Sequence, residues 1–199
     1  MPFIGNKPTA VPLSGADLED DIITSAKISD GTITASDLDL TDNYDFTGTV
    51  TGAGGVNTPA FFVYKSSIQT LTDAAFNLIT FDTEQIDTNN AFASNTFTVP
   101  SGETGTYVIG AHVEYNAGDA SNLRDTGIEI RINGTVEARQ QSYFEANYPL
   151  RQSQRIEKVV SLSAGDTVTI YGLLNVGSAT CQALGQDKGT NFYGYKIIE

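Results

Sequence analysis

The sequence is poor in the residues that build disulfide frameworks and metal sites. Its 199 residues include one cysteine, Cys181, so no intrachain disulfide can form and a small secreted disulfide scaffold is excluded. A single histidine, His112, excludes metal sites built from several histidines and leaves one candidate base for a Ser-His-Asp triad. No apolar run approaches the roughly 18 residues that cross a bilayer, so we expect no membrane insertion.

Positive charge is also scarce. Eleven Lys and Arg residues stand against 24 Asp and Glu residues, which gives a formal net charge of −13. Nucleic acids and anionic lipid surfaces are bound by clusters of Lys and Arg, so we expect neither as a partner. The N-terminal residues MPFIGNKPTA lack a basic region followed by an apolar stretch, so they are not expected to be a secretory signal.

The first 60 residues differ in composition from the rest of the chain. They hold nine acidic and two basic residues, one Tyr and two Phe, and so lack the bulky side chains that fill a core. We do not expect them to fold as an independent monomeric globule. Within residues 13–43 an apolar side chain recurs at every fifth position, at Leu13, Leu18, Ile23, Ile28, Ile33 and Leu38.

A period of five matches neither an α-helix nor a β-strand. Repeats this short bury their apolar positions only against stacked neighbours or against identical chains around an axis. The favoured interpretation is an intertwined homotrimeric shaft, with these side chains on its threefold axis. A pentapeptide-type β-helix and a disordered tail with accidental spacing are the alternatives.

Two further segments flank this shaft. Residues 1–12 contain three prolines, which are excluded from most ladder positions, and the side chains of Pro2, Phe3 and Ile4 make an apolar tip. Such a tip either frays or is captured by a partner. Residues 44–59 read as a short strand, or collar, followed by a glycine-rich hinge.

From Ala60 onward the sequence predicts strand after strand. Glycine, threonine and asparagine are abundant, which suits strands joined by tight turns. The expected strands cover residues 60–65, 77–81, 95–99, 106–115, 127–133, 135–141, 156–162, 166–174 and 190–198. Short strands at this spacing indicate a sandwich or a barrel.

Three features predict which side chains of these strands are buried and where one pair of strands turns. Alternation over residues 106–115 predicts a buried row of Tyr107, Ile109, Ala111, Val113 and Tyr115. Alternation over residues 127–133 predicts that Ile128, Ile130 and Ile132 are buried, with Glu129 and Arg131 on the other side. Asn133-Gly134 predicts a two-residue hairpin of type I′, which needs two positive φ angles.

Several spaced motifs carry a family resemblance. They are Phe81-Asp82, Asp87, Asn89 and Phe92; Phe97, Val99-Pro100 and Gly105-x-Tyr107; Leu162-Ser163-Ala164-Gly165-Asp166-x-Val168; and the closing Phe192-x-Gly194-Tyr195. With these motifs, residues 61–199 resemble the jelly-roll domains of the complement globular-head and tumour necrosis factor superfamily. The resemblance implies an all-β, ten-stranded-type jelly-roll sandwich at residues 60–199, with its closing strand beside its first. It also implies a tight homotrimer with aromatic packing on the threefold axis.

The N-terminal third resembles a different group of proteins. The opening MPFIGNKPT, the repeats ITSAKISDGTIT and the collar YDFTGTVTGAGG are similar to virion fibre and adhesin proteins of tailed bacteriophages. The order of anchor, shaft, collar and jelly-roll head is the most telling part of this resemblance. It implies that residues 1–12 bind another virion protein, in the capsid or the tail.

No catalytic, cofactor-binding or metal-binding site stands out. His112 falls on the strand face opposite the apolar row, with only Glu114 and scattered hydroxyls nearby, and is expected at the surface or at a trimer contact. Cys181 has apolar neighbours and is expected to be a small buried residue. The loop at 116–127 carries the oxygen ligands that calcium favours, at Asp119, Asn122 and Asp125, although solvated turn residues explain it as well.

One aromatic and basic segment could form a recognition surface. Its residues are Arg139, Tyr143, Phe144, Tyr148, Arg151 and Arg155. Such residues favour recognition, including stacking on sugar rings. The favoured interpretation is nevertheless a trimer contact, with an aromatic core and a basic rim that faces acidic residues of the next protomer, and a ligand surface is the alternative.

These features together predict a non-enzymatic structural protein on the surface of a phage particle. The expected molecule is a trimeric fibre or spike that attaches through its N-terminus and presents a head for adhesion to the host surface. A host-surface glycan is the expected receptor. A capsid-decoration protein without a receptor role, a secreted or cell-surface binding module, and a hydrolase of surface polysaccharide are the alternatives.

Overall fold

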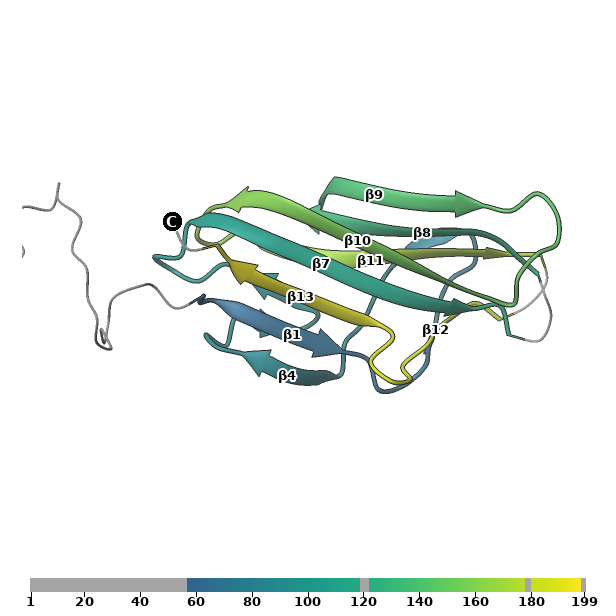
Figure 1. The fold of residues 1–199 in the computed structure, drawn as a ribbon, viewed down its shortest axis with the longest axis horizontal. Helices are drawn as coiled ribbons and strands as arrows, with labels where there is room; N and C mark the ends of the chain where they lie inside the picture. Colours follow the sequence, from purple (N-terminus) through teal and green to yellow (C-terminus); the bar gives the residue numbers. More distant parts are fainter. Residues whose placement is uncertain (1–56, 119–121, 178–179, 198–199) are drawn as a thin grey trace, which may run out of the picture. The chain divides into compact units, whose positions relative to one another are not determined.

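The computed structural model describes residues 57–118, 122–177 and 180–197, which form strands and turns without a helix (Figure 1). The expected anchor at residues 1–12, the shaft at 13–43 and most of the collar at 44–59 lie outside the described residues. The same holds for the residues expected to act there: Pro2, Phe3, Ile4, Leu13, Leu18, Ile23, Ile28, Ile33 and Leu38.

Thirteen strands follow one another along the described chain. They are β1 (Ala60–Tyr64), β2 (Gln69–Thr70), β3 (Ala75–Leu78), β4 (Thr83–Asp87), β5 (Phe92–Ala93), β6 (Thr96–Thr98), β7 (Gly105–Asn116), β8 (Leu123–Ile132), β9 (Thr135–Tyr143), β10 (Arg151–Leu162), β11 (Thr167–Val176), β12 (Gln182–Ala183) and β13 (Asn191–Lys196). Each strand that the sequence predicts overlaps one of these. The sequence did not predict β4 or the strands β2, β5 and β12. The last three have two residues each and are too short to show a period.

The strands form two antiparallel sheets. Sheet A has the order β2-β12-β7-β13-β1-β4, with β10 paired to the other edge of β7 along its whole length. Sheet B has the order β5-β6-β11-β8-β9, with β3 beside β11. In Figure 1, β10, β7, β13, β1 and β4 run side by side across the molecule. The predicted all-β sandwich is confirmed.

The long strand β7 supplies the centre of the core. Its predicted row of Tyr107, Ile109, Ala111, Val113 and Tyr115 is fully buried. On β8 the predicted residues Ile128 and Ile130 are also fully buried, whereas Ile132, at the strand end, is half-buried. Each fully buried aliphatic side chain of this size stabilises the fold by roughly 1.5–3 kcal/mol.

A cluster of aromatic rings packs the two sheets together. The Phe61 ring stacks on Phe97, with ring centroids 4.5 Å apart, and meets the edge of Phe192 at 4.8 Å. Phe92 lies 6.0 Å from both Phe61 and Phe192. Because these residues come from β1, β5, β6 and β13, the cluster fixes the first and last strands of the domain against sheet B.

A polar contact joins the sheets along one side. The side chain of Gln154 on β10 points inward and is 2 % exposed. Its amide donates to the hydroxyls of Thr126 on β8 and Ser142 on β9, at 2.8 Å each. The neighbouring residue Arg155 therefore faces the outer side of sheet A.

The hairpin between β8 and β9 is the predicted one. Asn133 and Gly134 both have positive φ angles, 51° and 79°. The Asn133 amide also donates to Asp166 and accepts from the backbone of Thr167, so it ties the turn to β11. Beyond the turn, a bulge between Ile130 and Arg131 shifts the pairing by one residue.

The first and last described segments of the domain meet at one end. The N–H of Lys196 donates to the carbonyl of Pro59 at 3.0 Å, and the N–H of Ile197 donates to the carbonyl of Thr106 at 2.8 Å. Strand β13 pairs with β1 over five residue pairs. The closing strand thus lies beside the first strand, as the resemblance implies.

Candidate functional site

The segment that the sequence singled out for recognition is divided between two surfaces. Arg139 lies on the outer side of sheet B, where it contacts Glu129 and Phe76. Arg155 lies on the outer side of sheet A, where it contacts Tyr193. These two arginines therefore belong to different surfaces.

The other residues of that segment lie near the far end of the sandwich. Tyr143 closes β9 and is 71 % exposed, whereas Phe144 packs partly against the core. Tyr148 is half-buried, with the Arg124 guanidinium 5.5 Å from its ring. Arg151 opens β10, 4.0 Å from the Glu114 carboxylate.

The outer side of sheet A carries three cross-strand rows of side chains, which we call the sheet A face. Reading across β10, β7, β13 and β1, the first row is apolar and consists of Val159, Val108, Tyr195 and Ala60. The second contains Glu157, Gly110, Tyr193 and Phe62, and continues to Ile86 on β4. The third contains Arg155, His112, Asn191 and Tyr64.

The apolar residues of this face are open to solvent in the single chain. Val159 is 61 % exposed, Ile86 46 % and Tyr195 39 %. Isolated exposed apolar side chains are ordinary, but a contiguous patch marks an interaction surface. The rows place these side chains on one continuous face.

The middle of the sheet A face holds a polar bridge. The Tyr193 hydroxyl donates to Glu157 Oε2 at 2.5 Å and accepts from Arg155 Nη2 at 3.2 Å. Partial burial raises the pKa of Tyr193, and the neighbouring Glu157 carboxylate raises it further. The phenol therefore stays protonated and keeps the bridge at neutral pH.

His112 lies on the sheet A face, on the opposite side of β7 from the buried row. Its Nδ1 atom contacts the carbonyl oxygen of Gly189, so this nitrogen carries the hydrogen. Hollows of about 430 Å³ flank the ring on either side. One is lined by His112, Glu114, Arg151, Gln152 and Ser153, and the other by Phe62, His112, Arg155, Asn191 and Tyr193.

The first of these hollows has the residue types of a catalytic triad without its connections. A triad needs the acid on one imidazole nitrogen and the nucleophile on the other. Here Nδ1 is bonded to Gly189, and the Glu114 carboxylate lies toward Arg151 instead. Ser153, His112 and Glu114 therefore share a hollow without forming a proton relay.

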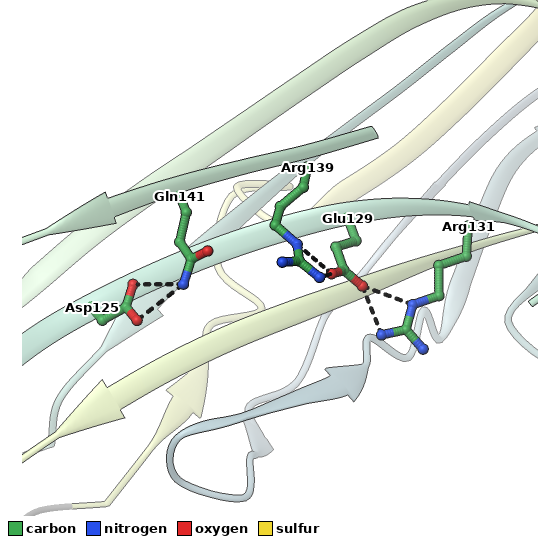
Figure 2. A network of polar contacts seen from close by, with 5 residues as sticks. All are labelled: Asp125, Glu129, Arg131, Arg139 and Gln141. Atoms are coloured by element: carbon green, nitrogen blue, oxygen red, sulfur yellow. Dashed lines mark hydrogen bonds and ion pairs between the residues drawn. The ribbon is translucent and has the colours of Figure 1, made fainter. Parts of the chain in front are cut away.

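The outer side of sheet B holds a buried ion cluster (Figure 2). Glu129 lies on the predicted side of β8, opposite the buried isoleucines, and its carboxylate is 0 % exposed. Arg131 donates from Nε to Glu129 Oε2 at 2.7 Å, and Arg139 donates from Nε to Oε1 at 2.6 Å. The two guanidinium groups cover the carboxylate, which sequence alternation alone could not show.

A second buried carboxylate lies on the same strand. The Asp125 carboxylate accepts from the Gln141 amide at 3.1 and 3.3 Å, as Figure 2 shows. Burial raises the pKa of Asp125, and the Gln141 hydrogen bond opposes this in part. In the loop expected to suit calcium, Asp119 lies outside the described residues, and Asp125 is already bonded to Gln141.

The cysteine is placed as expected. Cys181 is 3 % exposed, and its Sγ atom lies 3.4 Å from Asp73. Burial and the nearby Asp73 carboxylate raise the pKa of the thiol to about 12.

Over the described ranges, no group of three or more His, Cys, Asp and Glu side chains is arranged to hold a metal ion. Nor does the described part of the chain contain a helix with the length and apolarity of a membrane span.

Comparison with known proteins identifies the fold. No family model and no curated protein matches the sequence. The globular domain of zebrafish complement 1qA protein matches with a TM-score of 0.51 and 17% identity, over 70% of this chain and 98% of that one. Murine APRIL, of the tumour necrosis factor family, matches with a TM-score of 0.52 and 13% identity, over 69% of this chain and 98% of that one. The jelly-roll resemblance is therefore confirmed for the fold.

Proposed function

We propose that this protein is a homotrimeric structural protein of a tailed bacteriophage. Residues 1–12 attach it to the capsid or the tail, residues 13–43 form its shaft, and the head at 60–199 projects from the particle surface to bind a host glycan. The sequence order of anchor, shaft, collar and head supports the virion role. The exposed apolar rows of the sheet A face support the trimer.

The sheet A face is the surface that a trimer would bury. Its exposed apolar side chains Val159, Tyr195 and Ile86 span the sheet from β10 to β4. Removing apolar surface from water gains roughly 25 cal/mol per Å². In a trimer, one surface of each copy contacts a different surface of the next copy, and the three contacts close into a ring. Each copy therefore has its own sheet A face covered by one neighbour and covers the sheet A face of the other.

The edge strand β10 is suited to side-chain contact with a neighbouring copy. Among the described strands, β10 pairs only with β7, so its other edge is open. Charged side chains along it, including Arg155, Glu157 and Lys158, oppose uncontrolled strand addition. We therefore expect this edge to pack against the face of the next copy without extending the sheet.

Trimerisation also serves adhesion. A single head that binds a surface sugar weakly gains avidity when three heads are held together on one particle. The jelly roll places its first and last segments at one end, so the distal loops and the outer side of sheet B remain free for a ligand.

Mass measurement of matched variants tests the trimer. Light scattering of the full chain should give three times the chain mass of 21.2 kDa. Val159→Asp should shift this mass toward the monomer, because it places three carboxylates in the contact. Val136→Asp, on β9 of sheet B and 40 % exposed in the native protein, should leave it unchanged. A monomeric wild-type protein, or equal effects of the two variants, would contradict the proposed contact.

Labelling of particles tests the virion role. Gold-labelled antibodies against the head should decorate purified phage particles at the capsid surface or at the tail. Recovery of the protein only from particle-free supernatant would contradict the virion role and favour a secreted binding module.

A further inference from the structure

The outer side of sheet B holds two arginine side chains fixed on one buried carboxylate, which we call the arginine clamp. The carboxylate of Glu129, on β8, lies between Arg131 of the same strand and Arg139 of β9 (Figure 2). Each guanidinium uses its Nε and Nη2 atoms, Arg131 toward Oε2 and Arg139 toward Oε1. The carboxylate oxygens are therefore both occupied from the solvent side.

The clamp has unused hydrogen-bond donors. A guanidinium carries five N–H groups. In each arginine the edge formed by Nε and Nη2 faces Glu129, so the edge formed by Nη1 and Nη2 is left over. Within the described residues, Glu129 is the only hydrogen-bond acceptor of either group. The side chains of Arg131 and Arg139 are 23% and 48% exposed, so both remain in part accessible from solvent.

The clamp also has surplus charge. One arginine would neutralise Glu129, whereas two leave a net positive charge on this spot of a chain whose net charge is −13. A buried carboxylate is retained at modest cost when it is paired and hydrogen-bonded. The second arginine therefore exceeds what charge balance requires and is available for recognition.

Aromatic rings hold the guanidinium planes in position. The Arg131 Cζ atom lies 3.7 Å from the centroid of Tyr171, and the Arg139 Cζ atom lies 4.8 Å from that of Phe76. Both rings lie on neighbouring strands of sheet B. Because the side chains are ordered before a ligand arrives, binding loses less conformational entropy.

We propose that the arginine clamp binds the carboxylate of an acidic sugar. This inference rests on the proposed adhesion of the head to a host glycan. The planar fork of arginine matches a carboxylate, and Glu129 already shows both side chains in that role. A continuous polyanion is bound by many Lys and Arg side chains, and this chain carries a net charge of −13. The clamp therefore suits a glycan with isolated carboxylates better than a polyanion.

The same surface offers a ring for stacking. Tyr143 shares the outer side of β9 with Arg139, four residues along the strand, and is 71 % exposed. Four residues of a strand span roughly 13 Å. A ligand that reaches both groups is therefore an oligosaccharide longer than one sugar ring, with its acid on the clamp and a sugar face on Tyr143.

Titration of the full-length protein with short oligosaccharides tests the clamp. Sialyllactose and trigalacturonate are the acidic probes and maltotriose is the neutral one, with binding measured by saturation-transfer NMR and calorimetry. At least one acidic probe should bind in the millimolar range, and maltotriose should bind at least tenfold more weakly. Arg139→Gln should weaken acidic binding at least tenfold. Arg139→Lys, which keeps the charge without the fork, should weaken it severalfold.

A charge-matched variant provides the control. Lys188→Gln removes one positive charge from an exposed site in the turn before β13, away from sheet B, and should leave binding within twofold of wild type. Equal loss in Lys188→Gln and Arg139→Gln, or no binding of either acidic probe, would overturn the clamp. If Arg139→Gln fails to fold in a thermal melt, Arg139→Lys and Tyr143→Ala decide the question by the same titration.

Host-cell binding separates the two proposals. If the wild-type trimer binds host cells and the Arg139 variants bind equally well, the clamp is wrong and adhesion stands on another surface. If the wild-type trimer does not bind host cells, the adhesive function itself fails, whatever the titrations show.

Discussion

The ring of Tyr193 lies over Gly110, where the Cβ of any other residue would overlap the phenol. The two residues are paired across β13 and β7, and the ring reaches on to Glu157 and Arg155 of β10. One side chain thus crosses a neighbouring strand and links three strands of the sheet A face. The absence of a side chain at Gly110 is what allows this crossing.

Substitution of Gly110 should therefore destabilise the head. In Gly110→Ala the added methyl group must displace the Tyr193 ring, and overpacking of this kind costs about 1–3 kcal/mol. Thermal unfolding of the single variant, of Tyr193→Ala and of the double variant measures the coupling. We expect Gly110→Ala to cost little once Tyr193 is absent. The same cost in both backgrounds would contradict the contact.

Removal of the buried carboxylate on sheet B should cost more than removal of an exposed one. Glu129→Gln leaves two guanidinium groups without a charged partner, and we expect a loss of roughly 3 kcal/mol in unfolding free energy. Glu157→Gln, whose carboxylate is 50% exposed beside Arg155, should cost less than about 1 kcal/mol. Denaturant unfolding of the two variants makes the comparison, and equal losses would count against the buried ion cluster.

Acidification should weaken the contribution of Asp82. Partial burial acts to raise the pKa of this carboxyl, but hydrogen bonds from Ser67, Ser66 and Thr83 outweigh it and hold the pKa well below its usual range. Asp82 thus contributes stability above its unfolded pKa of about 3.9, which is lost as the pH falls through the folded value. Asp82→Asn should lower the melting temperature at pH 7 and lower it less at pH 3. An equal effect at both pH values would contradict this linkage.

Asp125 should show the opposite sign. Burial raises its pKa, so the protonated form favours the folded state. The stability that protonated Asp125 contributes is complete below its unfolded pKa of about 3.9 and is lost as the pH rises through its pKa in the folded protein. Asp125→Asn should therefore raise the melting temperature at pH 7 and leave it nearly unchanged at pH 3. A lower melting temperature at pH 7 would show that the ionised carboxylate is favourable there.

The thiol of Cys181 should react only in the unfolded protein. It is buried, and its pKa is raised to about 12, so the reactive thiolate is scarce at pH 8. Labelling by a chromogenic disulfide should be slow in buffer and should accelerate with denaturant in step with the loss of structure. Labelling in buffer at the rate of a free thiol would contradict the buried position.

Much of the head could be predicted where one face of a strand is buried. The alternation in β7 gave its buried row because period 2 determines side-chain direction in any strand. Asn133-Gly134 predicted the hairpin because few dipeptides accept two positive φ angles. Strand β10 begins at Arg151, before its predicted start at residue 156. Its first residues are polar and show no alternation, but they pair with β7, which is hydrogen-bonded to β10 along its full length.

The arginine clamp could not be predicted, since it depends on one bulge. With the pairing set by the turn, Ile132 lies opposite Thr135, and a regular ladder would place Glu129 opposite Ala138. The shift between Ile130 and Arg131 places Arg139 there instead, on the outer side. Bulges depend on local backbone energies that no residue pattern in this hairpin reveals.

The position of β1 determines how the head responds to mechanical tension. The chain enters β1 at Ala60, and β1 is hydrogen-bonded to β13 on one side and β4 on the other. A force applied between Pro59 and the distal loops acts along these strands. It therefore loads the hydrogen bonds of the β1–β13 and β1–β4 pairs in shear, all at the same time. A head that is pulled at Pro59 while its distal loops are held would therefore resist as a stiff joint, which fails in one step and does not open bond by bond.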